Sequence, residues 1–234
     1  MAEAFTERTA LIVGEAAVER LAAARVAVFG IGGVGGYVVE ALARAGIGTL
    51  DLFDPDTVSE TNINRQLLAL HSTVGLYKTD VAAARIRDIN PHATVNCHNV
   101  FYTPDNAEQF DLSQYDYIVD AVDTVSAKLE LAKRATALGV PIVSSMGTGN
   151  KLDATKLQIG DLSKTSVCPL ARAMRSLAKK AGIKHLRVVW STEEPTGSTL
   201  AAEGGRHAPG SISYVPATAG MLLAGEVISS LIKS

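Results

Sequence analysis

Side chains suited to phosphate chemistry crowd into one short segment, DPDTVSETNINRQ (54–66), and Lys78 follows soon after. Arg65 is a forked donor and Lys78 a point charge, and both stabilise negative charge on phosphate oxygens. A carboxylate such as Asp54 holds ribose hydroxyls. The other polar residues that we place at this nucleotide site are Asp56, Asn62 and Gln66. The set predicts a site where the α-phosphate of a nucleoside triphosphate is attacked.

A glycine-rich turn lies upstream, between the apolar run RVAVFG and a helical segment. Its glycines are Gly30, Gly32, Gly33 and Gly35. Such a turn brings backbone N–H groups close to a phosphate, and Asp54 follows about 20 residues later, where a dinucleotide fold places its ribose-binding carboxylate. These features alone favour an NAD-dependent oxidoreductase, but hydride transfer leaves the pyrophosphate intact and has no use for Arg65 and Lys78. The missing GxxxxGK[ST] motif excludes a P-loop NTPase.

Two carboxylates follow a later strand, in YIVDAVDTVSAK. Asp120 and Asp123 stand where this strand gives way to a helix, so a parallel sheet would bring them to the rim that carries the glycine turn. Asp123 is therefore a candidate ligand for the Mg²⁺ that accompanies a triphosphate. The alternative is that Asp123 only caps the following helix.

The elements that must position these residues are strands and helices, which alternate from Arg25 onward. The segments are RVAVFG, YVVEALARAG, GTLDLFD, LYKTDVAAARIRDIN, ATVNCHNV, YDYIVDAVD, TVSAKLELAKRATALG and PIVSSMG. Such βα units predict an α/β fold with a doubly wound, Rossmann-like, mostly parallel sheet covered by helices on both faces. Residues 25–149 form the nucleotide-binding core of this prediction.

After residue 149 the regular alternation of strands and helices stops, but no linker marks a second domain. The segments KLDATKLQIGDLSKT and LRVVWST indicate strands, and PLARAMRSLAKKAG and ATAGMLLAGEVISSLI indicate helices. We therefore expect residues 150–234 to be a C-terminal extension of the same sheet within a single domain, 1–234. The last, apolar helix is expected to pack on the sheet, with a membrane anchor or a dimer surface as the alternatives.

Composition narrows the class further. The chain of 234 residues is 47% hydrophobic with a net charge of −2. It has no run of about 18 consecutive apolar residues, and its acidic N-terminal segment differs from a secretory signal, so we expect a cytoplasmic protein with no membrane partner. Only two cysteines are present, which excludes a four-cysteine zinc site, and no zinc is expected. Cys168 is either a small buried residue before a helix or a reactive thiol.

Several of these motifs together resemble the ubiquitin-activating-like adenylating enzymes. They are VAVFGIGGVGGYVVEALARAGIG, DPDTVSETNINRQ, VGLYKTDVAAARIRDINP and DAVDTVSAK. The segments SSMGTGNKLDATKLQIGDLSKTSVCPLARAMR and HLRVVWSTEEP resemble a tRNA-modifying branch of that superfamily, so the resemblance covers almost the whole chain. It implies an enzyme that uses ATP to adenylate the carboxylate of threonylcarbamoyladenosine beside the anticodon. Ring closure then follows, with release of AMP and pyrophosphate.

The resemblance also implies a role for each site residue. The four glycines of the turn would cradle phosphate, Asp54 would hold the ribose, and Asp123 would bind Mg²⁺. Asn62, Arg65 and Lys78 would contact the triphosphate, and we take Arg65, Lys78 and Asp123 as the catalytic set. Arg8 matches the position from which the superfamily sends an arginine into the partner's ATP site, which implies a homodimer. The alternative for Arg8 is a solvated N-terminal charge.

The implied tRNA substrate suggests a role for a basic segment in the C-terminal half of the chain. Between Leu162 and Thr192 there are seven Lys or Arg residues and no Asp or Glu. Arg172, Arg175 and Lys179 fall on one stripe of the expected helix, where they would contact the phosphate backbone of tRNA, although such a stripe also occurs on merely solvated helices. Trp190 either stacks on a base or belongs to the core.

Three alternatives remain open. The first is an adenylyltransferase that acts on the C-terminus of a small sulfur-carrier protein, a partner that the tRNA hypothesis does not require. The position shortly before STE, where some relatives carry a cysteine, holds valine here, which weakens any thiol relay. The other two alternatives are an NAD-dependent oxidoreductase and a nucleotide-sensing module without turnover.

Overall fold

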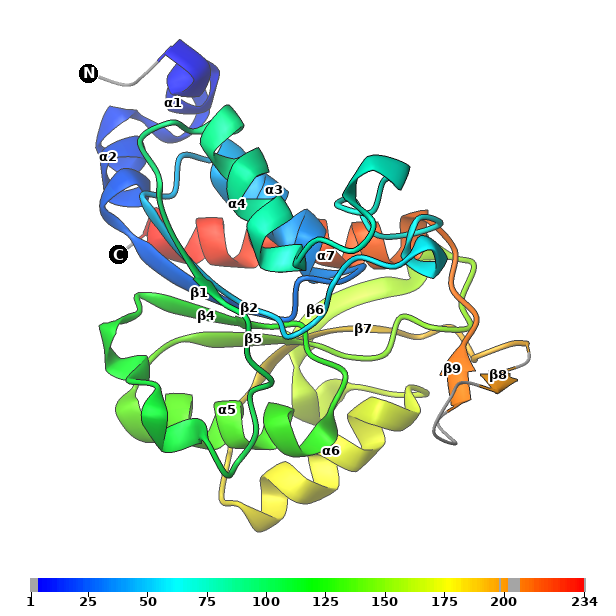
Figure 1. Ribbon diagram of the computed structural model, residues 1–234. Helices are drawn as coiled ribbons and strands as arrows, with labels where there is room; N and C mark the ends of the chain where they lie inside the picture. Colours follow the sequence, from blue (N-terminus) through cyan, green and yellow to red (C-terminus); the bar gives the residue numbers. More distant parts are fainter. Residues whose placement is uncertain (1–3, 198, 202–206, 234) are drawn as a thin grey trace.

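A seven-stranded sheet runs through the computed structural model, which describes residues 4–197, 199–201 and 207–233 (Figure 1). Its strand order is β3-β2-β1-β4-β5-β7-β6, and β6 pairs antiparallel with β7 while the other pairs are parallel. The strands are β1 (Arg25–Phe29), β2 (Thr49–Phe53), β3 (Thr94–His98), β4 (Tyr117–Asp120), β5 (Ile142–Ser145), β6 (Leu157–Asp161) and β7 (Arg187–Ser191). Two short strands, β8 (Thr199–Ala201) and β9 (His207–Pro209), pair separately.

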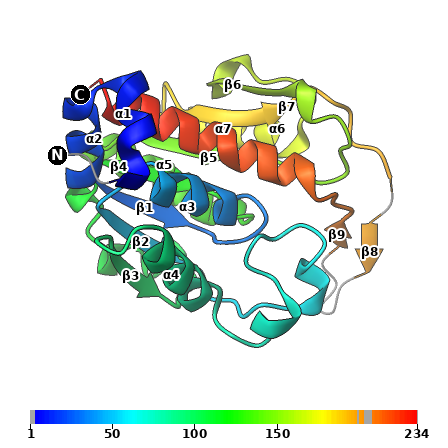
Figure 2. The same cartoon turned by 90° about the horizontal axis from the view of Figure 1, so that it is seen from above.

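Helices cover both faces of the sheet, as the sequence predicts. The helices are α1 (Glu7–Val13), α2 (Glu15–Ala23), α3 (Gly35–Arg44), α4 (Lys78–Ile89), α5 (Val125–Leu138), α6 (Pro169–Lys180) and α7 (Tyr214–Leu231). Helices α3, α4 and α7 pack on one face and α5 and α6 on the other (Figures 1 and 2). The predicted doubly wound α/β fold is confirmed.

The alternation of side chains along the strands explains the two cores. In β1, Val26 and Val28 join the cluster under α3 and α7, whereas Ala27 and Phe29 join the cluster under α5. All four are completely buried because successive side chains of a strand project to opposite faces and both faces are covered. This is why the central strands read as continuous apolar runs.

The residues after 149 extend the same sheet, as expected, with β7 beside β5 and β6 at the edge. Among the described residues, α7 is the one helix long and apolar enough to cross a membrane by length and composition. Its apolar face packs on the sheet and on α3 through Ala219, Leu223 and Val227, all completely buried (Figure 2). The interpretation of α7 as a core helix is confirmed.

An ion pair on the sheet predicts how stability responds to acid. Arg25 Nε and Nη2 each donate to an Asp51 oxygen at 2.9 Å, and Asp51 is buried. Burial alone would raise the pKa of Asp51, but hydrogen bonds from Arg25, Asn96 and His98 outweigh it and lower the pKa. A lowered folded-state pKa means that this stabilisation is present above the unfolded pKa and disappears as the pH falls through the folded value.

We therefore expect Asp51→Asn to destabilise the protein at pH 7, and the gap in urea midpoint to wild type should narrow as the pH falls from about 4 towards 2. Asp105→Asn, which alters an exposed carboxyl, serves as the matched control and should show no such narrowing. A gap for Asp51→Asn that is the same at pH 7 and pH 3 would contradict the assignment of this linkage to Asp51.

Candidate active site

The candidate site lies where the connections after β1 and β4 meet. The chain turns from β1 towards β2 and from β4 towards β5, and open α/β sheets bind ligands outside the carboxyl ends of strands at such a reversal. Gly30 N donates to Phe53 O at 2.8 Å, and Ala121 N donates to Phe29 O at 2.8 Å. The first bond fixes the glycine turn to the end of β2, and the second fixes the start of the β4–α5 loop to the end of β1.

Two glycines of the turn are required by its own packing. Gly30 has a φ of +87°, and a Cβ there would lie 2.7 Å from Ala121 O. A Cβ on Gly35 would lie 1.7 Å from Gly30 O. A side chain at either position would break the turn.

The other two glycines have room for a side chain. A Cβ on Gly32 would lie 3.7 Å from Gln66 Nε2, and a Cβ on Gly33 would lie 3.5 Å from Arg65 Cγ, which are ordinary contacts. Internal packing therefore does not explain glycine at these positions. Their bare backbone beside Arg65 and Gln66 suits the close approach of a ligand.

Asp54 and Lys78 lie together beside the turn. Asp54 accepts from Ile31 N at 2.6 Å and from Asp56 N at 2.9 Å, so it ties the glycine turn to the end of β2. Burial raises the pKa of Asp54, although Lys78 and the two backbone donors oppose the shift. Lys78, the first residue of α4, is buried, and its Nζ lies 2.7 Å from Asp56 Oδ2 and 3.8 Å from Asp54 Oδ1. The predicted cluster forms, with Lys78 held between two carboxylates.

Arg65 is the cation with unused donors. Its Nη1 donates to Thr61 O at 2.9 Å and Asn64 Oδ1 at 3.0 Å, which holds the side chain in place. No carboxylate contacts the guanidinium within the part of the chain that the structure describes, and burial lowers the pKa of Arg65. An arginine remains charged in proteins, so Nε and Nη2 are available for an anion.

The three amide side chains of segment 54–66 have different roles. Asn62 Oδ1 accepts from Ser59 N at 3.2 Å and so completes the capping box in which Ser59 caps the short 3₁₀ helix Glu60–Asn62. Asn64 Nδ2 donates to Ser211 O at 3.0 Å, which links the segment to the chain before α7. Gln66 is buried, and its Oε1 has no hydrogen-bond partner among the described residues. A ligand hydroxyl or amino group would satisfy this oxygen.

Asp123 is exposed at the rim, as the metal hypothesis requires. The cap alternative is wrong, because α5 begins after Thr124 and no side chain caps it, and the Asp123 carboxylate accepts only from Thr124 Oγ1 at 3.2 Å in the described structure. The described residues contain no group of three His, Cys, Asp or Glu side chains that could hold a metal ion. A single exposed carboxylate still fits Mg²⁺, which proteins bind through one or two carboxylates plus substrate phosphates.

Asp120 has a different role, which sequence analysis did not identify. Both of its oxygens accept from Lys128 Nζ, at 3.0 and 3.1 Å, and Ser144 Oγ donates to the same carboxylate. Lys128 is completely buried under the rim, and Val122 N donates to Asp120 Oδ1 at 3.2 Å. This cluster therefore fixes the loop that carries Asp123. The only sequence signal was a lysine eight residues after Asp120, the fourth residue of α5.

A second unforeseen contact supports the same edge of the sheet. Glu193, within the STEEP sequence, accepts from Leu152 N at 2.9 Å and Asp153 N at 2.8 Å. Buried Lys151 donates to Glu193 O at 2.6 Å. Glu193 thus holds the connection after β5 to the connection after β7. The glycine-rich segment 197–210 lies only partly within the described residues, and no role is assigned to it.

Arg8 lies far from the glycine turn of its own chain. It is exposed on α1, and a Cβ on Gly46, just after α3, would lie 3.1 Å from Thr6 Cγ2. Helix α1 therefore adjoins the C-terminal end of α3, whereas the turn opens its N-terminal end (Figure 1). Ten residues of helix, roughly 15 Å, separate the two ends.

The basic stripe forms only in part. Arg172 and Lys179 are exposed on α6, but Arg175 is half-buried, and its Nη1 donates to Thr165 O at 2.8 Å and to Thr165 Oγ1. Trp190 is buried beside α6, so the suggestion that it stacks on a base is wrong. Cys168 is likewise buried, which confirms the interpretation as a small residue before a helix.

The fold and the rim define a nucleotide-binding protein of the doubly wound α/β class. A model of the ThiF family matches residues 6–234, and the chain belongs to this family. It is 42% identical to the tRNA threonylcarbamoyladenosine dehydratase of Bacillus subtilis (strain 168), over 97% of this chain and 94% of that protein.

Two further comparisons bear on the alternatives. The solved structure of the Escherichia coli tRNA N6-threonylcarbamoyladenosine dehydratase in complex with ATP superposes with a TM-score of 0.89 and 36% identity, over 99% of this chain and 96% of that one. The adenylyltransferase and sulfurtransferase uba4 of Aspergillus clavatus is 32% identical, and the match spans 92% of this chain but 40% of that protein. The similarity therefore favours the tRNA-modifying branch over the sulfur-carrier branch.

Proposed function

We propose that this protein is an ATP-dependent tRNA threonylcarbamoyladenosine dehydratase, which adenylates the carboxylate of that nucleoside and promotes its cyclodehydration. The substrate follows from the similarity to the Bacillus subtilis enzyme over nearly the whole of both chains. Within the site, the observation that carries adenylation is Arg65, a half-buried cation with unused donors beside the bare backbone of Gly33. An NAD site would need no such cation. A cytoplasmic location is part of the same proposal.

A carboxylate is a poor electrophile because its oxygen is a poor leaving group, and adenylation makes that oxygen part of AMP, a good leaving group. An oxygen of the substrate carboxylate attacks the α-phosphorus of ATP, the bond to the β-phosphate oxygen breaks, and pyrophosphate leaves. The acyl adenylate then loses AMP when a nucleophile of the same threonylcarbamoyl group attacks its carbonyl carbon and closes the ring. No protein nucleophile is needed, so the protein contributes positioning and charge stabilisation.

Each residue at the rim has a part in this scheme. Arg65 donates from Nε and Nη2 to the phosphates, and the Asn62 amide N–H₂ adds a neutral donor. Lys78 is held by Asp54 and Asp56 at the start of α4, close to the ribose that Asp54 would bind. Asp123 would hold Mg²⁺, which supplies charge neutralisation on the phosphates when bound.

The experiment that tests the function is mass spectrometry of the nucleosides from tRNA incubated with ATP and this protein. Threonylcarbamoyladenosine should lose one water, with one AMP and one pyrophosphate formed per product. AMP formation that depends instead on a small carrier protein with a C-terminal glycine would overturn the assignment, as would tight NADH binding without ATP binding.

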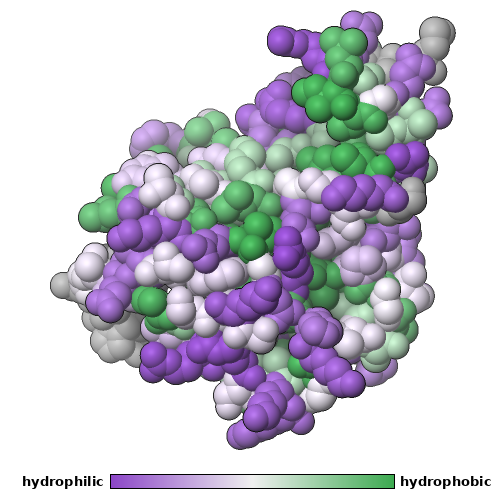
Figure 3. All heavy atoms as spheres, turned by 180° about the vertical axis from the view of Figure 1, so that it is seen from behind, coloured by the Kyte–Doolittle hydropathy of each residue, from purple (hydrophilic) through white to green (hydrophobic). Residues whose placement is uncertain are grey.

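We also propose that the protein acts as a homodimer in which Arg8 enters the partner's site. Leu11 and Ile12 on α1 are each 87% exposed, and apolar side chains gather on the protruding end that carries α1 (Figure 3). A mostly apolar groove lies alongside, lined by α1, α3 and α7 residues that include Thr9, Tyr37 and Met221. A second copy of the chain would cover this surface, and two-fold symmetry would make the two subunits equivalent, so that each Arg8 would enter the other subunit's site.

Mixing two inactive variants tests this geometry. Arg8→Ala and Arg65→Ala should each be inactive alone, but a mixed dimer contains one site with Arg65 from one subunit and Arg8 from the other. Co-expression should therefore restore roughly a quarter of wild-type AMP formation, since half of the dimers are mixed and each has one complete site. No recovery from a verified mixed dimer would show that Arg8 does not act across the interface.

A further inference from the structure

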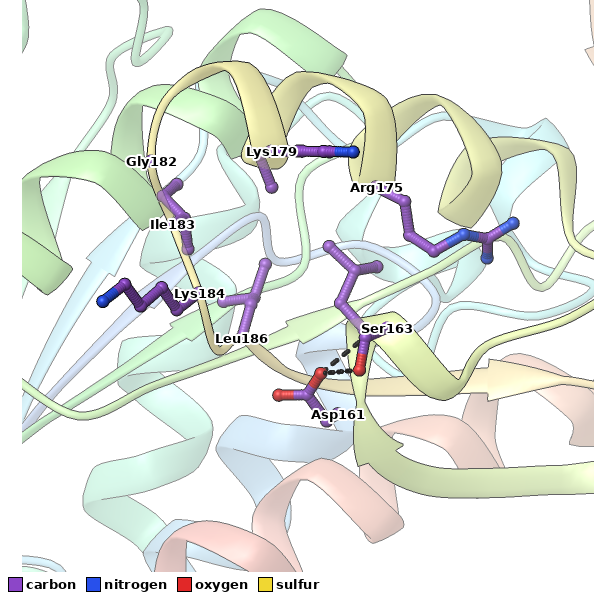
Figure 4. A pocket seen from close by; sticks show the side chains of 10 residues that line it. Asp161, Ser163, Arg175, Lys179, Gly182, Ile183, Lys184 and Leu186 are labelled. Carbon is purple, nitrogen blue, oxygen red and sulfur yellow. Dashed lines mark hydrogen bonds between the residues drawn. The ribbon is translucent and has the colours of Figure 1, made fainter.

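A second cavity lies on the opposite face of the sheet from α3, the helix that follows the glycine turn. It has a volume of about 510 Å³ and is bounded by α6, the turn after β6 and the segment that leads into β7. Its floor is apolar, made by buried side chains that include Leu162, Ile183 and Leu186. Figure 4 shows Arg175 and Lys179 extending from α6 on one side, with Asp161 and Ser163 facing them. The volume lies within the range of small-ligand sites.

The charges around this cavity are mostly positive. Arg175, Lys179 and Lys184 line it, and Lys179 and Lys184 are exposed. The one acidic lining residue, Asp161, is already engaged: its Oδ1 accepts from Ser163 N at 2.8 Å and Oγ at 2.5 Å, and its Oδ2 lies 3.4 Å from His185 Nδ1. An apolar floor with a cationic rim suits a ligand that combines a phosphate with a ribose or base.

The position of α6 connects the cavity to the active site. A Cβ on Gly147, just after β5, would lie 3.6 Å from Cys168 Sγ, so α6 begins at the catalytic edge of the sheet. The helix then runs back for 12 residues, roughly 18 Å, to Lys180 and the cavity. Arg172 is exposed along this path. Helix-end stabilisation accounts for lysines in the last turn of α6 but not for Lys184 or for the cavity.

We propose that this cavity binds the sugar–phosphate backbone of tRNA, away from the nucleotide that is modified. The inference rests on the proposed function and deepens it, because α6 would lead the RNA backbone from the catalytic edge to the cavity. The contact would position the tRNA without reading its sequence.

The test compares Lys179→Glu/Lys184→Glu with Arg87→Glu/Lys233→Glu, which makes the same change in net charge at exposed positions elsewhere. The cavity variant should raise the KM for tRNA at least tenfold and leave kcat and the KM for ATP unchanged. The slope of log K for tRNA binding against log salt should become shallower by about 1.5 to 2, with no such change in the control. Unchanged thermal unfolding verifies that both variants are folded.

Two results would overturn the inference. One is a cavity variant whose KM for tRNA and salt slope equal those of the control. The other is binding of inorganic phosphate that the cavity variant loses while its tRNA binding is unaffected, which would identify a small-anion site. If wild type forms no dehydrated nucleoside, the proposed function fails instead, and the two variants still decide the inference through their tRNA binding.

Discussion

Replacing Arg65 by alanine is expected to lower the rate of AMP formation about 10³-fold, the scale on which single cations and donors stabilise phosphoryl and oxyanion transition states. The guanidinium is held by Thr61 O and Asn64 Oδ1 on one nitrogen and presents its remaining donors to the site. Its hydrogen bonds within the chain are to exposed Thr61 and Asn64, so the free energy of unfolding should change by no more than about 0.5 kcal/mol. Pyrophosphate release and urea unfolding measure the two effects.

Two companion variants sharpen this result. Arg87→Ala removes an exposed arginine from α4 and should leave AMP formation unchanged. Arg65→Lys keeps the charge but loses the fork, so its activity should fall between wild type and Arg65→Ala. Near-normal AMP formation by Arg65→Ala would remove this residue from the mechanism.

Lys128→Met is expected to destabilise the protein by about 3–5 kcal/mol, because it leaves the Asp120 carboxylate buried without its counter-ion. Lys128 and Asp120 have side-chain exposures of 0% and 1%, so solvent does not screen the loss. Urea unfolding at pH 7 measures this loss of stability.

The same helix offers a matched control. Lys133→Met removes a lysine that is 47% exposed and pairs with Glu130, and it should change stability by at most about 0.5 kcal/mol. Adding Asp120→Asn to Lys128→Met should recover part of the lost stability, because the amide carries no charge. If Lys128→Met proves as stable as Lys133→Met, the cluster does not hold the loop of Asp123.

The fold was predictable because each of its elements has a local signal. The strands are short apolar runs buried on both faces, and the glycine turn between β1 and α3 has a spacing that few other structures require. The antiparallel edge strand β6 was recognised as a strand, but its direction depends on pairing with β7, which no local pattern encodes. The local sequence of α7 does not decide its role either, because an apolar helix of this length fits a membrane segment as well as a core helix.

The site was predictable as a set of residues and less so as a set of roles. Asp54, Arg65 and Lys78 all lie in the segment that runs from the end of β2 to the first residue of α4, and Asp54 holds this segment to the glycine turn through Ile31 N. That Lys78 is neutralised by two acids while Arg65 is not depends on side-chain direction, which spacing does not determine. Lys128 and Ser144 were missed because a lysine on a helix is usually a solvated residue, and only the packed structure shows that it is buried.

The separation of Arg8 from its own glycine turn by the length of α3 has a consequence for assays of this protein. If each complete centre needs two chains, activity per milligram is not constant but falls when the protein is diluted below the dissociation constant of the pair. Rates measured at nanomolar concentration would then report association rather than chemistry. Adding the otherwise inactive Arg65→Ala chain to such a dilute sample should raise the rate, since it donates an intact Arg8.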